Sequence, residues 1–161
     1  MTLVVEPAPA GYSDWPGVLD LLRRSFAYME GRIDPPSSLN RIDLAELMKK
    51  AREETALLAF DDGVLVGCAF VRAAGDCLYL GKLAVDRAAR GRGVARRLLE
   101  AAESRARDEG LGFIELQTRI ELTENHETFR RLGFRKTAET AHEGYDRPTS
   151  ITMRRAVVPA G

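Results

Sequence analysis

The sequence predicts an α/β (α+β) fold in which helices flank a mixed, mostly antiparallel sheet of about seven strands, with about four helices in all. Apolar periods of two and of 3.6 residues alternate in the order β-α-α-β-β-β-α-β-α-β-β. Asp61-Asp62-Gly63, between two apolar runs, is a strong hairpin signal. Leu78–Thr118 then reads as a βαβ unit. With no linker or repeat, we expect a single domain over residues 1–161.

Composition excludes several function classes. The 24 Lys and Arg residues equal the 24 Asp and Glu residues, so no overall field recruits nucleic acid or a membrane surface. The N-terminus lacks a signal-peptide pattern, and no apolar stretch approaches the roughly 18 residues of a membrane span. We therefore expect a cytoplasmic protein. Cys68 and Cys77 lie in apparent strands without metal-ligand spacing, which favours buried thiols over a disulfide and predicts no metal site.

The first half of the chain contains two predicted helices between short strands. Pro7 and Pro9 stop the first strand. Residues 30–40 are dense in turn formers and too polar for the core. The elements expected here are the strand Thr2–Pro7, the helix Trp15–Met29, a helix Leu39–Glu53 with Ile42, Leu44, Leu47 and Met48 apolar, and the hairpin strands Ala56–Phe60 and Val64–Arg72.

The second half is organised around one long amphipathic helix. Its apolar stripe begins at Val94, and Gly110 lies where a helix C-cap is expected. The stripe is Val94, Leu98, Ala101, Ala102 and Ala106. Thr123 is expected to cap the next helix. The remaining elements expected are the strands Cys77–Val85, Phe113–Thr118, Arg135–Thr140 and Ser150–Val157, and the helix Thr123–Leu132.

The strand before the long helix contains a change of phase. Leu78 and Leu80 share one face by alternation, whereas Leu83 and Val85 have the opposite parity. A slip of one residue, with Gly81 inside it, is what a β-bulge produces. A bulge leaves backbone N–H and C=O groups unpaired and free to bind a ligand. Continuous burial on both faces is the alternative explanation for this apolar run.

The loop from Arg90 to Ala95, RGRGVA, predicts an anion site. Small residues stand where the first backbone N–H groups of a helix are unpaired and the helix dipole is positive. Arg90 and Arg92 add charge-assisted hydrogen bonds to a phosphate. The alternative is a tight turn whose glycines supply only geometry. The loop is not a Walker A motif, and Arg96 occupies a position that the dinucleotide fingerprint reserves for a small residue.

A second motif, Asn125–Phe134 with the sequence NHETFRRLGF, follows some thirty residues later. Together with Leu83-Ala84-Val85 and the loop Arg90-x-x-Gly93-x-Ala95, it resembles the GNAT superfamily of acetyl-CoA-dependent N-acetyltransferases. The resemblance implies that the parallel strands Cys77–Val85 and Phe113–Thr118 splay apart and hold the pantetheine arm of acetyl-CoA. The cofactor-binding residues it implies are Leu83, Ala84, Val85, Arg90, Gly91, Arg92, Gly93, Val94, Ala95, Asn125 and Phe129.

Phe129 is a departure from the family pattern. Many members have a Tyr there that protonates the leaving thiolate, and Phe cannot donate a proton. Tyr145 and Tyr79 are candidate replacements, with Tyr145 favoured because it lies in a polar loop; an unassisted thiolate is also plausible. Asn125 corresponds to a position that often contacts the cofactor arm, with helix capping as the alternative. The base candidates are Glu121, favoured, and His126, His142 and Glu115.

The acceptor is expected at the two segments least like core, Met29–Ser38 and His142–Thr149. Its binding residues are predicted to be Arg32, Asp34, His142 and Tyr145, although Arg32 and Asp34 could equally pair with each other. The predicted function is direct transfer of an acetyl group, in a ternary complex, to the amine of a small molecule or peptide. The alternatives are a non-catalytic acyl-CoA sensor and a general nucleotide-binding site. A homodimer is frequent in such folds.

Overall fold

The computed structural model describes residues 2–38 and 41–159. Its elements, in chain order, are β1 (Leu3–Pro7), α1 (Trp15–Phe26), the 3₁₀ turn η1 (Ala27–Met29), α2 (Leu44–Glu53), β2 (Thr55–Asp61), β3 (Val64–Ala74), β4 (Cys77–Val85), the 3₁₀ turn η3 (Arg87–Ala89), α3 (Val94–Asp108), β5 (Phe113–Arg119), α4 (Thr123–Arg131), β6 (Arg135–Thr140) and β7 (Ser150–Ala156).

Within the described residues, the sheet has seven strands in the order β1-β2-β3-β4-β5-β7-β6. Among the described strands, β4 and β5 form the parallel pair, and the other neighbours are antiparallel. The parallel pair follows from the crossover through α3, because a right-handed βαβ unit returns its second strand in the same direction. The predicted mixed, mostly antiparallel sheet with four flanking α-helices is confirmed.

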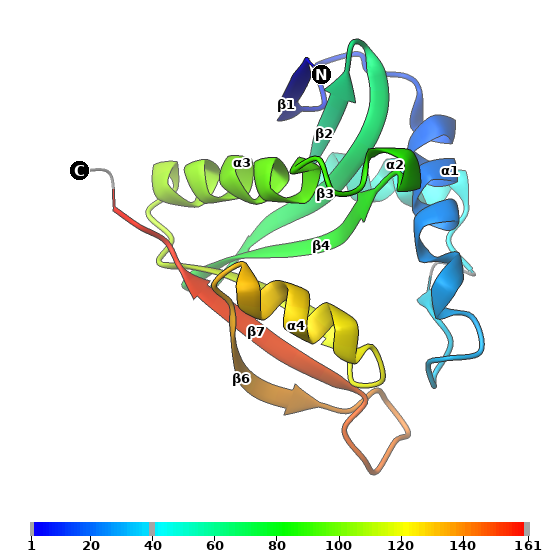
Figure 1. Cartoon of the computed structure of the whole chain (residues 1–161), viewed down its shortest axis with the longest axis vertical. Helices are drawn as coiled ribbons and strands as arrows, with labels where there is room; N and C mark the ends of the chain where they lie inside the picture. The colour runs from blue at the N-terminus through cyan, green and yellow to red at the C-terminus, as the bar shows by residue number, and fades with distance from the viewer. Residues whose placement is uncertain (1, 39–40, 160–161) are drawn as a thin grey trace.

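Two apolar clusters lie on opposite faces of the sheet. On one face, α3 buries Leu98 and Leu99 against strand residues such as Ile114, and α4 adds the partly buried Phe129. On the other face, α1 and α2 pack against β2 and β3, with Leu22 fully buried. Burying a side chain of this size contributes about 1.5–3 kcal/mol relative to exposure. Because α3 and α4 contribute to the same cluster, both helices lie on the same side of the sheet (Figure 1).

The sheet opens between β4 and β5. These strands pair only where Cys77–Tyr79 lies opposite Phe113–Glu115, at their first residues. Beyond that point Leu80–Val85 of β4 has no partner in β5, and Figure 1 shows β4 and β7 running apart with α4 over β7. We call this opening, between Leu80–Val85 and residues 116–119, the β4–β5 splay. It matches the splay that the family resemblance implies.

Several element boundaries differ from the sequence predictions. The helix α1 ends at Phe26 and continues as the 3₁₀ turn η1. The second helix begins at Leu44 rather than Leu39, because the Asp43 side chain accepts a hydrogen bond from Glu46 N and caps it. Leu39 and Asn40, the predicted start, lie outside the described residues. Thr123 is not the cap of α4: Leu122 holds that position, without a side-chain hydrogen bond.

Two predictions about burial also need correction. Met48, expected on the apolar stripe of α2, is 38% exposed, whereas Leu47 beside it is buried. Leu99, left off the predicted stripe of α3, is buried together with Leu98 because the helix is covered over more than one row of side chains. Both cysteines are buried free thiols, as predicted. No helix within residues 2–38 and 41–159 is long and apolar enough to cross a membrane.

Candidate active site

The predicted β-bulge is present in β4. Cys68 of β3 faces Ala84, but Phe70 faces Gly81, so Lys82 and Leu83 together oppose a single residue of β3. Lys82 has the left-handed φ of 53°, which is uncommon for a residue with a side chain. The slip returns Leu83 to the face that Leu78 and Leu80 occupy, toward α3. The bulge therefore lies within Leu80–Val85, the part of β4 that borders the β4–β5 splay.

The loop before α3 forms a pocket. Gly91 and Gly93 have φ of 79° and 81°, and a Cβ built on either glycine would meet no described atom within 4 Å beyond its own residue and its two chain neighbours. Gly93 is the N-cap of α3 and leaves the first N–H groups of the helix without a side-chain cap. The pocket, of about 300 Å³, is lined by Val85, Ala89, Arg90, Gly91, Gly93, Val94, Ala95, Arg96, Thr128, Arg131 and Leu132.

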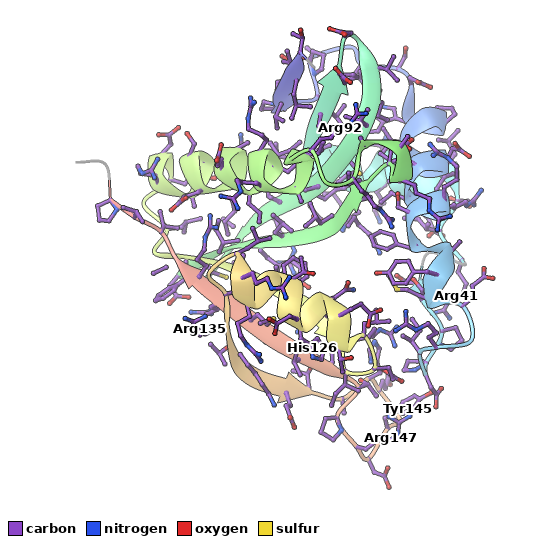
Figure 2. All side chains as sticks on the ribbon, in the orientation of Figure 1. Arg41, Arg92, His126, Arg135, Tyr145 and Arg147 are labelled. Carbon is purple, nitrogen blue, oxygen red and sulfur yellow. The ribbon has the colours of Figure 1, made fainter. Side chains whose placement is uncertain are left out.

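The described lining holds three arginine side chains and no carboxylate. With the positive end of the α3 dipole, it is suited to a polyanion such as a pyrophosphate. Arg96 and Arg131 were not predicted: Arg96 lies within the first turn of α3, and Arg131 comes from the last turn of α4. Arg92, a predicted ligand, is exposed and does not line the pocket; it lies in the loop before α3 (Figure 2).

The segment between α1 and α2 contacts β5, the second of the two strands that border the β4–β5 splay. Arg119, at the end of β5, donates to the carbonyl of Pro35 at 2.6 Å and to that of Pro36 at 3.2 Å. Partial burial lowers the pKa of this guanidinium. Ser25 of α1 donates to Val85 O, at the end of β4. Helix α1 thus contacts β4, and the α1–α2 segment contacts β5.

Asp34 connects this segment to the β6–β7 loop. Its carboxylate accepts from the Tyr145 hydroxyl at 2.6 Å and from Arg147 at 3.0 Å. Figure 2 shows Tyr145 and Arg147 on the loop that leads into β7. Arg32 forms an ion pair with Glu124 at 2.7 Å, so Arg32 and Asp34 do not pair with each other. The two predicted acceptor segments are therefore in contact.

Glu121 is the base candidate whose surroundings leave an oxygen available. Its Oε2 accepts from the backbone N of Asp34 at 3.0 Å, whereas Oε1 is buried without a hydrogen-bond partner among the described residues. A buried, unpaired carboxylate oxygen is costly unless a donor reaches it. The ammonium group of a substrate amine is such a hydrogen-bond donor.

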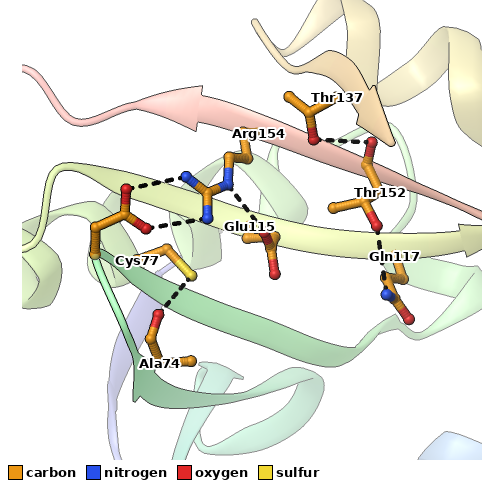
Figure 3. A network of polar contacts seen from close by, with 8 residues as sticks. Ala74, Cys77, Glu115, Gln117, Thr137, Thr152 and Arg154 are labelled. Carbon is orange, nitrogen blue, oxygen red and sulfur yellow. Dashed lines mark hydrogen bonds and ion pairs between the residues drawn. The ribbon is translucent and has the colours of Figure 1, made fainter. Parts of the chain in front are cut away.

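The other base candidates have partners. Glu115 accepts from Arg154 at 2.9 Å (Figure 3), and Arg154 also donates to the Asp76 carboxylate. His126 Nε2 lies 2.9 Å from Arg119 O. His142 Nδ1 is bonded to Thr149 Oγ1, and burial lowers the pKa of His142, which favours the neutral imidazole. Among the described residues, no group of three His, Cys, Asp or Glu side chains could hold a metal ion.

The candidate acids differ in where their hydroxyl protons point. Tyr145 donates to Asp34, and this hydrogen bond raises the pKa of Tyr145. Burial raises the pKa of Tyr79, whose ring stacks 4.8 Å from the Arg72 guanidinium.

Phe129, on α4, packs edge-on against Phe134, with ring centres 5.8 Å apart. Asn125 does not cap α4: its Nδ2 donates to the Tyr28 hydroxyl at 3.0 Å, a contact that no sequence pattern indicates.

Lys82 is a further group that the sequence predictions assigned no role. Its Nζ donates to Ser38 Oγ at 3.1 Å, which joins the bulge to the α1–α2 segment. Burial and the nearby Lys50 lower the pKa of Lys82. The signal was present in the sequence, because a charged residue within an otherwise apolar strand marks the position of the phase slip.

Comparison with known proteins gives one family and many similar folds. A profile of the acetyltransferase (GNAT) family matches residues 15–134. No curated protein sequence matches significantly. The PaiA N-acetyltransferase of Thermoplasma acidophilum, solved with coenzyme A, is 14% identical with a TM-score of 0.78, over 97% of this chain and 99% of that one.

Two further structures have the same fold. The ribosomal-protein-S18-alanine N-acetyltransferase of Escherichia coli is 16% identical with a TM-score of 0.72, over 99% of this chain and 97% of that one. An aminoglycoside 6'-N-acetyltransferase complexed with coenzyme A is 18% identical with a TM-score of 0.74, over 98% and 99% of the two chains.

Proposed function

The chain belongs to the acetyltransferase (GNAT) family, and from this premise we propose that it transfers the acetyl group of acetyl-CoA to the amine of a small molecule or peptide. The observation that most supports this function is the position of the arginine-lined pocket, which shares Val85 with the border of the β4–β5 splay. A ligand that is a polyanion at one end and a long amide-containing arm at the other matches both features.

The residues present fit coenzyme A. The open space over Gly91 and Gly93 lets a phosphate approach the backbone N–H groups at the start of α3. Arg90, Arg96 and Arg131 supply countercharge. Leu83, Ala84 and Val85 offer a strand edge that β5 does not pair, where the amides of pantetheine would bind. Asn125 and Phe129 lie on α4, which is on the same side of the sheet as α3.

Acetyl-CoA supplies, when bound, a thioester whose carbonyl carbon is open to attack by an amine. The protein has to orient the two reactants and move protons. Glu121 Oε1, buried and unpaired, is placed to accept a hydrogen bond from the acceptor amine and to take its proton. Backbone N–H groups freed at the bulge, around Lys82, would polarise the carbonyl oxygen. Tyr145 stays the sequence prediction for the acid.

The acceptor would bind at the contact between the two predicted segments. Asp34 and Tyr145 join them; Arg32 belongs to the first segment and His142 to the second. Because Arg32 is paired with Glu124 and Asp34 with Arg147, these side chains act first by holding the loops together, and an acceptor must compete with those pairs to reach them. Loops on a rigid scaffold of this kind commonly set substrate choice.

Release of free coenzyme A from acetyl-CoA across a panel of amines tests the proposal. Turnover with at least one amine supports acetyl transfer. Tight acetyl-CoA binding without turnover on any amine would instead favour the acyl-CoA sensor. This hypothesis stays an alternative because Phe129 replaces the usual proton donor. Calorimetry with acetyl-CoA, ATP and NAD separates both from a general nucleotide site, which predicts comparable affinities for all three.

A further inference from the structure

The helix α4 has no proton donor at the position where the family resemblance expects one. Phe129 fills that position, and its ring packs against Phe134 as part of the core below α3 and α4. Replacing the ring would disturb packing rather than expose a polar group. Any proton delivered to the leaving sulfur has to come from another element.

The hydroxyl of Tyr28 lies over the same helix, one turn before Phe129. Asn125 and Phe129 are four residues apart in α4, so their side chains share one face. Asn125 Nδ2 lies 3.0 Å from the Tyr28 hydroxyl. Tyr28 belongs to η1, directly after α1, which is itself bonded to β4 through Ser25 and Val85. Tyr28 therefore extends from the β4 side of the splay to its α4 side.

The hydrogen bond also sets which way the phenol can act. The Asn125 amide is the donor, so the Tyr28 oxygen is the acceptor and its own proton stays available. The Arg32 guanidinium lies 5.8 Å from the centre of the Tyr28 ring and is itself paired with Glu124. Tyr28 is 37% exposed, so water can return a proton to it. Tyr145, by contrast, directs its proton at Asp34.

We propose that the Tyr28 hydroxyl protonates the departing thiolate of coenzyme A in the acetyl transfer. This inference rests on the proposed function. As the amine nitrogen forms its bond to the carbonyl carbon, the carbon–sulfur bond breaks, and Tyr28 gives its proton to the sulfur. The surplus proton of the amine passes to Glu121, and water then carries that proton from Glu121 to the phenolate, which restores both side chains. The products are the N-acetylated amine and coenzyme A with a neutral thiol.

The first test compares steady-state kinetics of three Tyr→Phe variants. Tyr28→Phe keeps the ring beside Arg32 and removes only the hydroxyl. We expect kcat to fall about 100-fold, the low end for general-acid catalysis, because a thiolate is already a good leaving group, with the KM for acetyl-CoA unchanged. Tyr12→Phe is the control, since Tyr12 packs on Trp15 at the other end of α1. A drop in Tyr145→Phe but not in Tyr28→Phe would overturn the assignment.

The second test does not depend on turnover. Coenzyme A is bound to the wild type and to Tyr28→Phe, and ionisation of its thiol is followed by the ultraviolet absorbance of the thiolate. A hydroxyl that donates to the thiolate lowers the pKa of the thiol, so we expect that pKa to rise in Tyr28→Phe. An unchanged thiol pKa would show that Tyr28 only joins η1 to α4. Failure of coenzyme A to bind the wild type would contradict the proposed function instead.

Discussion

Arg119 at the end of β5 donates through one guanidinium nitrogen to Pro35 O at 2.6 Å and through the other to Pro36 O at 3.2 Å. This two-pronged contact holds the α1–α2 segment across the end of the β4–β5 splay. The same segment supplies Tyr28, Arg32 and Asp34, each bonded to a residue beyond the splay. The proposed acceptor side of the site is thus assembled by contacts between loops, whereas the proposed cofactor side rests on α3 and β4.

Arg119→Lys tests this division of the site. Lysine keeps the charge but cannot hold both carbonyls in one fixed geometry. We expect the KM for the amine to rise severalfold while the KM for acetyl-CoA stays within about twofold, because the loop contacts lie away from the α3 pocket. Steady-state kinetics with each substrate varied in turn measures both constants. An unchanged KM for the amine would show that the loop contacts do not shape the acceptor site.

A negative charge in the α3 pocket should abolish binding of coenzyme A. Gly93→Glu places it there directly, but φ of 81° strains any side chain at this position. Ala95→Glu introduces the same charge inside α3, where the backbone accepts glutamate. We expect calorimetry to show at least a 100-fold loss of affinity, because the carboxylate repels the pyrophosphate. The control is Ser104→Glu, exposed near the other end of α3; equal affinities in the two variants would refute the pocket assignment.

Glu121→Gln should slow turnover about 100-fold and leave acetyl-CoA affinity unchanged, since the amide keeps the shape of the side chain but cannot take a proton. The isosteric control is Glu115→Gln, because Arg154 already holds that carboxylate at 2.9 Å. Rates are measured at saturating acetyl-CoA and saturating amine. If Glu115→Gln were the slower variant, the base would lie on β5 rather than after it.

The ion pair between Asp76 and Arg154 should make stability depend on pH at the paired end of β4 and β5. The hydrogen bond from Arg154 lowers the pKa of Asp76, so the pair stabilises the fold above the ordinary carboxyl pKa of about 4 and this contribution is lost as pH falls below it. Asp76→Asn should therefore reduce the free energy of unfolding more at neutral pH than at acidic pH. Urea unfolding at both pH values measures the difference, with Asp62→Asn, in the β2–β3 turn, as control; an equal loss at both pH values would contradict the argument.

The sequence predicted the parts of this site that local pattern determines. The slip between Leu80 and Leu83 identified the bulge, and the glycines before Val94 identified the pocket at α3. Both are properties of a strand or a turn, which periodicity and φ requirements reveal. Leu122 took the cap position expected for Thr123, because capping depends on where the preceding loop places the chain.

The contacts between loops were beyond the sequence. Tyr28 and Asn125 are 97 residues apart, and Asp34 and Tyr145 are 111 apart. Nothing in the local pattern of either segment favours one partner over another charged or polar side chain. Such pairs form only after the sheet has set the distance between its two halves, so they follow from tertiary structure. The proposed acceptor side was for this reason the least predictable part of the molecule.

Mass spectrometry of the acceptor after incubation with isotope-labelled acetyl-CoA tests acetyl transfer to an amine most directly, because release of coenzyme A alone could also reflect hydrolysis. The account predicts a labelled acetyl group on an amine nitrogen of at least one acceptor, with no labelled product formed by Ala95→Glu. Labelled acetate as the sole product, or no product despite bound acetyl-CoA, would contradict it.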